Sequence, residues 1–291
     1  MNDSLSLGAR LFITLQHLLP QHGLSRLVHR ATRIETVWFK NLLIRLFMKG
    51  FRPDVSDAVE TNVLAYPSFN AFFTRALRED ARPLAADPRA IICPVDGTVS
   101  EAGPIDQERL LQAKGRTYTL AALLAGQTDW ARQFEGGLFA TIYLAPYNYH
   151  RIHMALAGRL LETWFVPGKL FSVNRVTAMG VDSVFARNER VVCCFDDNGL
   201  QHAMVMVGAL NVGSIETVWH GEIAPRHPRS FAKIPLPAAA GSPDLARGAE
   251  LGRFNMGSTV ILLLPRDRAR WSADFISGRT VRMGEAIGER L

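Results

Sequence analysis

The sequence predicts an α+β protein in which amphipathic helices at the N-terminus precede a β-rich, sandwich- or barrel-like body. Helical spacing of apolar residues dominates before Arg52, whereas short apolar runs separated by Gly, Pro, Asn and Asp dominate after about residue 90. The 291 residues are 48% hydrophobic and 21% charged, which excludes a disordered chain or a fibrous repeat. We therefore expect a basic helical region, residues 1–65, and a body with a sizeable core, residues 66–291.

Two stretches of the N-terminal region have an apolar face. The first ends at Pro20, because proline lacks the backbone N–H that a helix needs. Its apolar residues are Leu5, Leu7, Leu11, Phe12, Leu15, Leu18 and Leu19. The second, roughly residues 24–48, sets Trp38, Phe39 and several leucines against Arg33 and Lys40. Such helices can lie in a membrane surface or pack on the body with their basic faces in water, and the pattern alone leaves both open.

The net charge of +6 lies entirely in residues 1–52, which contain eight basic and two acidic side chains. Residues 53–291 contain 25 side chains of each sign and are neutral. A basic end on a neutral body favours a local anionic partner, such as an anionic phospholipid membrane, over a nucleic acid.

If the N-terminal helices lie on a membrane rather than on the body, the chain is expected to be peripheral, on the cytoplasmic side of the cell membrane. The uncharged stretch 11–25 is 15 residues long and too short to span a bilayer. No secretion signal is evident at the N-terminus. The three cysteines, Cys93, Cys193 and Cys194, give no disulfide framework and favour a reducing compartment.

The body is predicted to begin with a helix, because Ser68 is a good N-cap and Phe69, Phe72 and Phe73 have helical spacing. A further helix is expected at residues 119–125, and a mobile loop at 235–249. Strands are expected at residues 91–92, 137–144, 158–165, 191–195, 203–207 and 259–264.

Four residues in three short stretches are candidates for chemistry. Asp96 lies in a Pro-Val-Asp-Gly turn, His150 and His153 lie three apart, and Ser258 opens an apolar strand after Gly257. Asp96, His153 and Ser258 have the residue types of a charge relay, in which a base activates a serine hydroxyl. His150 is then free to contact the substrate. The spacing of the His and Cys residues predicts no metal site.

Together these stretches resemble the phosphatidylserine decarboxylase proenzymes, most closely their shorter bacterial, membrane-associated branch. Met256-Gly257-Ser258-Thr259 is similar to the Leu-Gly-Ser-Thr cleavage motif of that family, with Met in place of Leu. That replacement nearly conserves volume, so processing is still expected. Further similar stretches are residues 94–97, 149–154, 166–174, 185–190, 212–219 and 248–254.

The resemblance implies that the chain cleaves itself between Gly257 and Ser258 into a large chain, 1–257, and a small chain, 258–291. Ser258 then becomes a covalent pyruvoyl group, the only cofactor, which forms a Schiff base with phosphatidylserine and releases phosphatidylethanolamine and CO2. His153 is implied as the base for cleavage, oriented by Asp96, and His150 as the residue for substrate positioning or proton transfer. A homodimer is also implied.

Three alternatives make different predictions. A serine hydrolase that uses Ser258, His153 and Asp96 without self-cleavage predicts an intact chain. A non-enzymatic membrane-binding module predicts lipid binding that survives replacement of Ser258. A pyruvoyl enzyme for a soluble amino acid leaves the N-terminal amphipathic helices unexplained.

Overall fold

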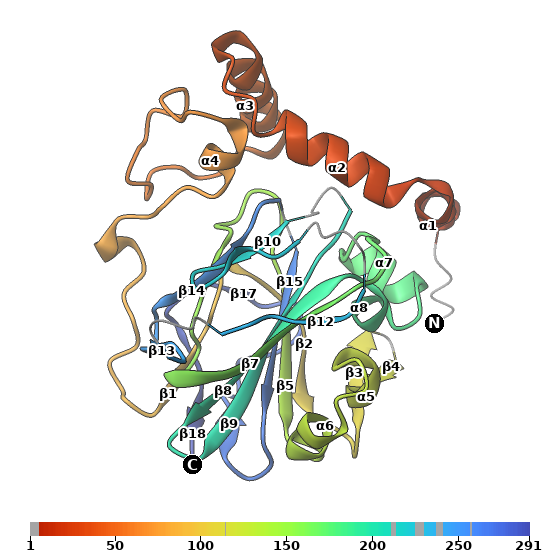
Figure 1. Ribbon diagram of the computed structural model, residues 1–291, viewed down its shortest axis with the longest axis vertical. Coiled ribbons are helices and arrows are strands. Elements are labelled where there is room, and N and C mark those ends of the chain that lie inside the picture. The colour runs from red at the N-terminus through yellow and green to blue at the C-terminus, as the bar shows by residue number, and fades with distance from the viewer. Residues whose placement is uncertain (1–5, 114, 211–213, 225–229, 237–240, 257) are drawn as a thin grey trace.

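A computed structural model describes residues 6–113, 115–210, 214–224, 230–236, 241–256 and 258–291. A sheet-rich body forms most of the molecule, and helices α1 (Leu7–Leu18), α2 (Gln21–Ala31) and α3 (Val37–Phe51) lie across one end of it (Figure 1). This arrangement confirms the predicted α+β class.

The largest sheet has nine strands, and every pairing within it is antiparallel. Its order is β12 (Ala232–Lys233), β7 (Gly158–Val166), β8 (Arg190–Asp197), β9 (Leu200–Val207), β15 (Thr259–Leu264), β5 (Leu138–Tyr143), β2 (Gly97–Pro104) and β17 (Thr280–Val281), and β13 (Asp244–Leu245) also pairs with β7. The six strands expected from the sequence are therefore confirmed, five of them in this sheet and one, β1, in a smaller sheet.

Three smaller sheets and five short helices complete the body. A four-stranded sheet has the order β11 (Gly221–Glu222), β10 (Ile215–Thr217), β14 (Glu250–Phe254) and β6 (Arg151–His153). A three-stranded sheet has the order β1 (Ala90–Ile92), β18 (Ala286–Arg290) and β16 (Ala269–Trp271), and β3 (Arg109–Ala113) pairs with β4 (Arg116–Thr119). The helices are α4 (Phe69–Phe73), α5 (Leu120–Leu123), α6 (Thr128–Phe134), α7 (Arg175–Gly180) and α8 (Val184–Arg187), with a 3-10 turn at Glu79–Ala81.

Strand β15 lies inside the large sheet, hydrogen-bonded to β5 on one side and β9 on the other. All six of its side chains are buried. Burial of each large aliphatic side chain contributes roughly 1.5–3 kcal/mol, so this strand anchors the C-terminal part of the chain.

The single helix expected at residues 24–48 is wrong: the chain forms α2 and α3 there, separated at residues 32–36. The break has a tertiary cause, because the carbonyl of Thr32 accepts a hydrogen bond (2.8 Å) from the backbone N–H of Asn70 in α4. The helix predicted after Ser68 is confirmed, with the Ser68 hydroxyl accepting from the Ala71 N–H at 3.2 Å.

Two buried glutamines fasten the first helices to the body. The Gln16 side-chain oxygen accepts from the Ser172 N–H (2.7 Å), and that of Gln21 accepts from the Leu170 N–H (2.8 Å). Buried amides that are fully hydrogen-bonded fix the geometry of the segments they join. Helices α1 and α2 are therefore held against the segment 168–174.

A second, smaller core joins α3 to α4 and is separate from the main core. Its members are Ile44, Phe47, Phe69, Phe72 and Phe73, with Phe47 meeting three of the other rings edge-on. The predicted boundary between residues 65 and 66 runs through this cluster, and the division into two regions stays a prediction.

The loop predicted at 235–249 lies partly outside the described residues, at 237–240. Its later part contains strand β13, because Asp244 and Leu245 pair with Arg159 and Gly158 of β7.

We expect residues 258–291 to stay bound after a cut between Gly257 and Ser258. They supply three strands that pair with the rest of the chain. Strand β15 pairs with β5 and β9, β17 pairs with β2, and β18 pairs with β1. A purification tag at Leu291 should retain the large fragment in high salt and release it in concentrated guanidinium. Recovery of residues 258–291 alone under native conditions would contradict this prediction.

Candidate active site

Ser258 lies immediately before β15 and is fully buried, with 0% of its surface exposed. Its hydroxyl donates a hydrogen bond to the Val207 carbonyl of β9, and its own carbonyl accepts from the Leu144 N–H at 2.8 Å. The predicted cleavage partner, Gly257, lies outside the described residues. Ser258 is therefore held on both sides by neighbouring strands.

The residue two positions before Ser258 has an unfavourable backbone conformation. Met256 has φ +130°, which residues with a side chain rarely adopt. Such a conformation costs roughly 1–3 kcal/mol and persists only where the surroundings enforce it. Strain next to the predicted scissile bond favours a reaction that frees this segment.

An apolar cavity of about 280 Å³ lies beside this segment. Met256 and Leu144 line it on the body side, and Phe47, Phe51 and Phe73 line it from α3 and α4. The N-terminal helices thus form one wall of a cavity next to Ser258.

His150 lies behind this wall, stacked on Phe73 with ring centroids 4.1 Å apart. Its Nδ1 donates to the Asn148 carbonyl at 2.8 Å, which leaves the lone pair on Nε2. Nε2 is buried and has no hydrogen-bond partner within the described part of the chain. Burial lowers the pKa of His150 to about 3, so the ring is neutral and its Nε2 is available as an acceptor.

His153 lies in β6 and lines a different cavity, of about 290 Å³, together with Arg82 and Gly248. Its Nδ1 donates to the Gly248 carbonyl at 2.8 Å, and its Nε2 accepts from the Tyr149 hydroxyl at 3.1 Å. Burial lowers the pKa of His153 as well. Because the chain enters a strand at Arg151, residues three apart point in opposite directions, and the two histidines occupy different surroundings.

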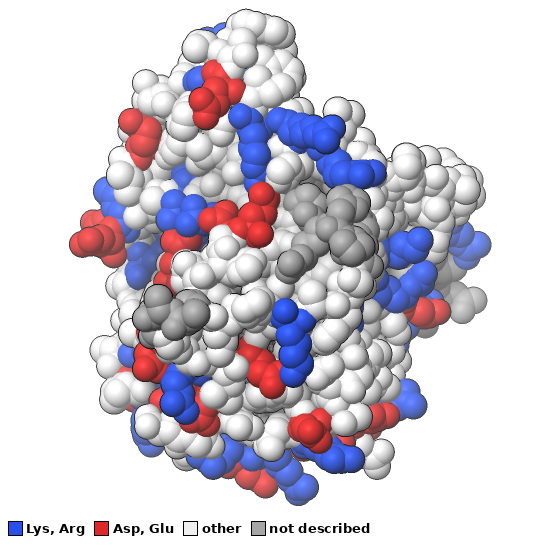
Figure 2. All heavy atoms as spheres, in the orientation of Figure 1, with Lys and Arg blue, Asp and Glu red and all other residues white. Residues whose placement is uncertain are grey.

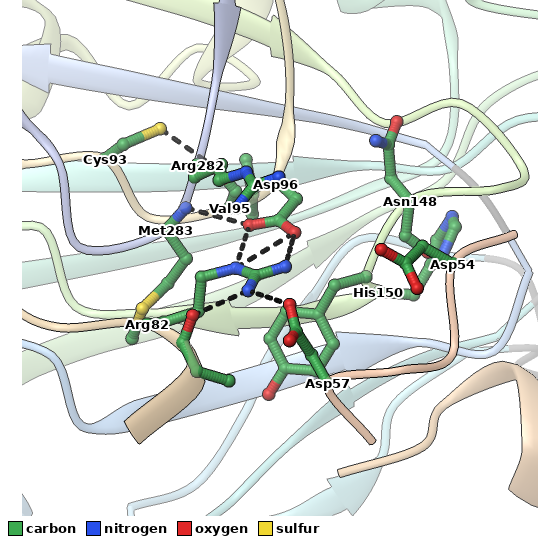
Figure 3. Close-up of polar contacts among 12 residues, drawn as sticks. Asp54, Asp57, Arg82, Cys93, Val95, Asp96, Asn148, His150, Arg282 and Met283 are labelled. Atoms are coloured by element: carbon green, nitrogen blue, oxygen red, sulfur yellow. Dashed lines mark hydrogen bonds and ion pairs between the residues drawn. The ribbon is translucent and has the colours of Figure 1, made fainter. Parts of the chain in front are cut away.

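Asp96 is paired with Arg82 (Figure 3). The Arg82 guanidinium donates to both carboxylate oxygens at 2.6–3.2 Å, and the Met283 N–H donates to one of them at 2.9 Å. Arg82 also contacts Asp57 at 2.8 Å. In Figure 3 the Asp96–Arg82 pair lies apart from His150 and Asn148.

The three residues predicted to form a charge relay are therefore not joined in this structure. Among their described partners, Asp96 contacts Arg82 and Met283, His153 contacts Tyr149 and Gly248, and Ser258 contacts Val207. A guanidinium satisfies a buried carboxylate better than a neutral imidazole does, because two charge-assisted hydrogen bonds form. The roles of Asp96 and His153 in cleavage stay predictions.

Glu189 is a residue that the sequence did not single out. It is only 1% exposed, and its Oε2 has no hydrogen-bond partner among the residues that the structure describes. Burial raises its pKa to about 7. In sequence it stands between Asn188 and Arg190 in a polar stretch, so nothing local indicates burial.

No group of three or more His, Cys, Asp or Glu side chains that could hold a metal ion occurs within the described ranges.

Comparison with known proteins identifies the family of this chain. The family model described as phosphatidylserine decarboxylase matches residues 69–289, and a second model, described as PSD, matches residues 11–52. The chain belongs to the phosphatidylserine decarboxylase family.

Curated relatives in this family match almost end to end. A phosphatidylserine decarboxylase proenzyme of Methylococcus capsulatus is 49% identical over 97% of this chain and 98% of its own. Proteins of the same name from Azotobacter vinelandii and Alkalilimnicola ehrlichii are 51% and 54% identical, over 96% and 86% of this chain and 98% and 86% of their own. The family membership inferred from the sequence is confirmed.

The raised pKa of Glu189 predicts a pH-dependent stability. Because the folded-state pKa is about 7 and the ordinary value is 4.5, the folded protein retains a proton that the unfolded chain loses. The retained proton contributes roughly 3 kcal/mol to the free energy of unfolding. This contribution is complete below about pH 4.5 and is lost as the pH rises through about 7.

To measure it, thermal unfolding of the uncleaved Ser258→Ala chain is compared with that of Ser258→Ala/Glu189→Gln. The double variant should gain stability relative to the single variant as the pH rises from about 5 to about 8. Parallel stability curves over this range would show that Glu189 does not titrate as its burial implies.

Proposed function

We propose that this chain is a self-processing, pyruvoyl-dependent decarboxylase that converts phosphatidylserine into phosphatidylethanolamine and CO2. The observation that carries the proposal is the placement of Ser258: in this member of the family it is buried at the head of β15, after a strained Met256 and beside an apolar cavity. The proposed cut between Gly257 and Ser258 gives chains 1–257 and 258–291.

Self-cleavage begins when the Ser258 hydroxyl turns toward the preceding carbonyl. Oγ attacks that carbonyl, a C–O bond replaces the C–N bond, and the released nitrogen takes up a proton. We assign His153 as the base and Asp96 as its orienting group, which requires His153 to release Tyr149 and Asp96 to release part of its contact with Arg82. The strain at Met256 lowers the cost of this backbone movement.

The residues around position 258 fit a pyruvoyl group. The position is fully buried, and His150, which contacts Phe73 of the adjacent cavity, is neutral with an unpartnered Nε2 among the described residues. When present, the group supplies a ketone that binds the substrate amine and accepts electrons as CO2 leaves. His150 accepts a hydrogen bond from the substrate headgroup or moves its proton, and the apolar wall of Phe47 and Phe73 excludes water.

The proposed substrate is an anionic lipid, and the N-terminal helices fit a membrane surface. Leu7, Leu11 and Leu18 of α1 are 69–85% exposed, and Trp38 of α3 is 70% exposed. Lys and Arg side chains gather over α2 (Figure 2). None of the described helices is long and apolar enough to cross a bilayer. We propose peripheral attachment to the cytoplasmic side of the cell membrane, and a homodimer.

Not all of the N-terminal positive charge is available to lipid. Lys40 is buried and donates to the Leu64 carbonyl at 2.8 Å, and Arg33 pairs with Glu222 of β11 at 2.9 Å. These two residues fasten the helices, so Arg10, Arg30, Arg45 and Lys49, which are exposed, are the better candidates for lipid contact.

A serine hydrolase without self-cleavage is not supported. The relatives that match this chain are named proenzymes, a name that implies processing of the chain.

The deciding experiment is intact-mass spectrometry of the purified chain and of Ser258→Ala. The wild-type protein should give two chains, with the smaller starting at position 258 and lighter by one ammonia than a serine-initiated peptide. Ser258→Ala should stay whole and inactive on phosphatidylserine, because the attacking oxygen is gone. An uncut wild-type chain that also stays uncut with lipid would refute the proposal.

Replacement of His150 by Ala should leave self-cleavage within a few-fold of wild type and lower decarboxylation about 100-fold or more. Single-turnover product formation and the fraction of cut chain, measured on one sample, separate the two effects. His202→Ala is the matched control, since His202 is equally buried but lies at the far end of β9. Equal loss of both activities in His150→Ala would exclude the division of labour.

Replacement of Leu11 and Leu18 by Gln should weaken binding to phosphatidylserine vesicles at least about tenfold, because two exposed leucines no longer enter the bilayer. Cosedimentation measures binding, and the extent of self-cleavage should not change. Ile276→Gln, at a 62% exposed apolar residue of the body, is the control. If the control weakens binding as much as the double variant, α1 is not the membrane contact.

A further inference from the structure

Glu189 and Ser258 belong to one row that crosses the large sheet. Arg190 pairs with Val207, and Val207 pairs with Thr259, so one residue further along the chain Glu189 faces Gly208 and Gly208 faces Ser258. Hydrogen bonds continue this register: the Gly208 N–H donates to the Glu189 carbonyl, and the Leu144 N–H to the Ser258 carbonyl, both at 2.8 Å. Residues in one row of an antiparallel sheet have their side chains on the same face.

The residue between them is a glycine. Adjacent strands lie about 4.8 Å apart, which places the Cα atoms of Glu189 and Ser258 about 10 Å apart. Because Gly208 has no side chain, no side chain of this row stands between Glu189 and Ser258. The fourth member of the row, Leu144, lines the apolar cavity next to Met256.

The backbone around Glu189 is fixed, and the adjacent charged side chain is engaged elsewhere. The Asn188 side chain donates to the carbonyls of Phe171 and Gly208, both at 2.8 Å. The Arg190 guanidinium donates to the carbonyls of Ala122, Leu123, Ala186 and Asn188.

Burying a carboxyl oxygen without a hydrogen-bond partner costs free energy, so its presence here calls for an explanation. Since burial raises its pKa to about 7, Glu189 carries a proton in much of the population near neutral pH and can donate a hydrogen bond.

The reaction at Ser258 needs such a donor in its second step. After Oγ has attacked the preceding carbonyl, the chain is joined by an ester. The Cα proton of residue 258 then leaves to a base, its electron pair forms the Cα=Cβ bond, and the Cβ–Oγ pair departs with Oγ as part of the C-terminal carboxylate of Gly257. Negative charge therefore develops on Oγ in a buried site, where a hydrogen-bond donor is most effective.

We propose that the Glu189 carboxylic acid donates a hydrogen bond to Oγ of residue 258 as the Cβ–Oγ bond breaks. This role rests on the proposed self-cleavage and adds to it a specific acid for elimination. Formation of the ester does not require Glu189, so the two steps are separable.

The experiment compares Glu189→Leu, which removes the donor and keeps an apolar side chain of similar size, with Glu189→Gln, which keeps a donor. Each chain and the wild type are made in cell-free synthesis and quenched in denaturant at intervals. Half of each sample is treated with hydroxylamine, which splits an ester but not a peptide bond, and the products are weighed by mass spectrometry. Thermal unfolding verifies that each variant is folded.

Glu189→Leu should split on its own about 100-fold more slowly than wild type, while hydroxylamine releases a small chain that starts with serine. Glu189→Gln should split within about tenfold of the wild-type rate. A Glu189→Leu chain that splits at the wild-type rate would overturn the proposal. An uncut Glu189→Leu chain that hydroxylamine does not cleave would also overturn it, as would a Glu189→Gln chain that splits as slowly as Glu189→Leu. If the wild-type chain itself does not split, self-cleavage fails, and this inference fails with it.

Discussion

The central position of β15 is the constraint on which the rest of the structure depends. Its backbone groups are hydrogen-bonded to β5 and β9, and its six side chains are buried on the two faces of the sheet. A chain can be broken at the start of such a strand without losing the strand. The same burial fixes Ser258 within a row of neighbouring backbones, so its reactive atoms meet Leu144, Val207 and Gly208 at set positions.

The surroundings of Ser258 are closed and largely uncharged. His150 is neutral, Glu189 holds its proton in much of the population at neutral pH, and the adjacent cavity is lined mainly by apolar side chains. The charged pair Asp96–Arg82 lies elsewhere, beside the cavity of His153. Where water does not screen charge, a small change of charge on a reacting atom strongly changes its interaction energy with nearby groups. The two histidines, His150 and His153, therefore lie in different electrostatic surroundings.

Much of the fold follows from sequence because its causes are local. Apolar runs bounded by turn residues predicted β5, β7, β8, β9 and β15, and an N-cap serine predicted α4. The break between α2 and α3 did not follow, since it depends on a hydrogen bond between Thr32 and Asn70. Motifs in the sequence indicated the candidate residues Asp96, His150, His153 and Ser258, but not the residues to which they are hydrogen-bonded. Arg82 as the partner of Asp96 and the burial of Glu189 both depend on strand register and on contacts between distant segments.

Strand β15 also has a consequence for the life of the protein after cleavage. Before the cut, its pairing with β5 and β9 forms within one molecule, so folding is unimolecular and independent of concentration. After the cut, the same pairing joins two separate chains, and an unfolded protein must find its partner again in solution. Refolding of the cleaved form therefore depends on protein concentration, whereas refolding of the precursor does not.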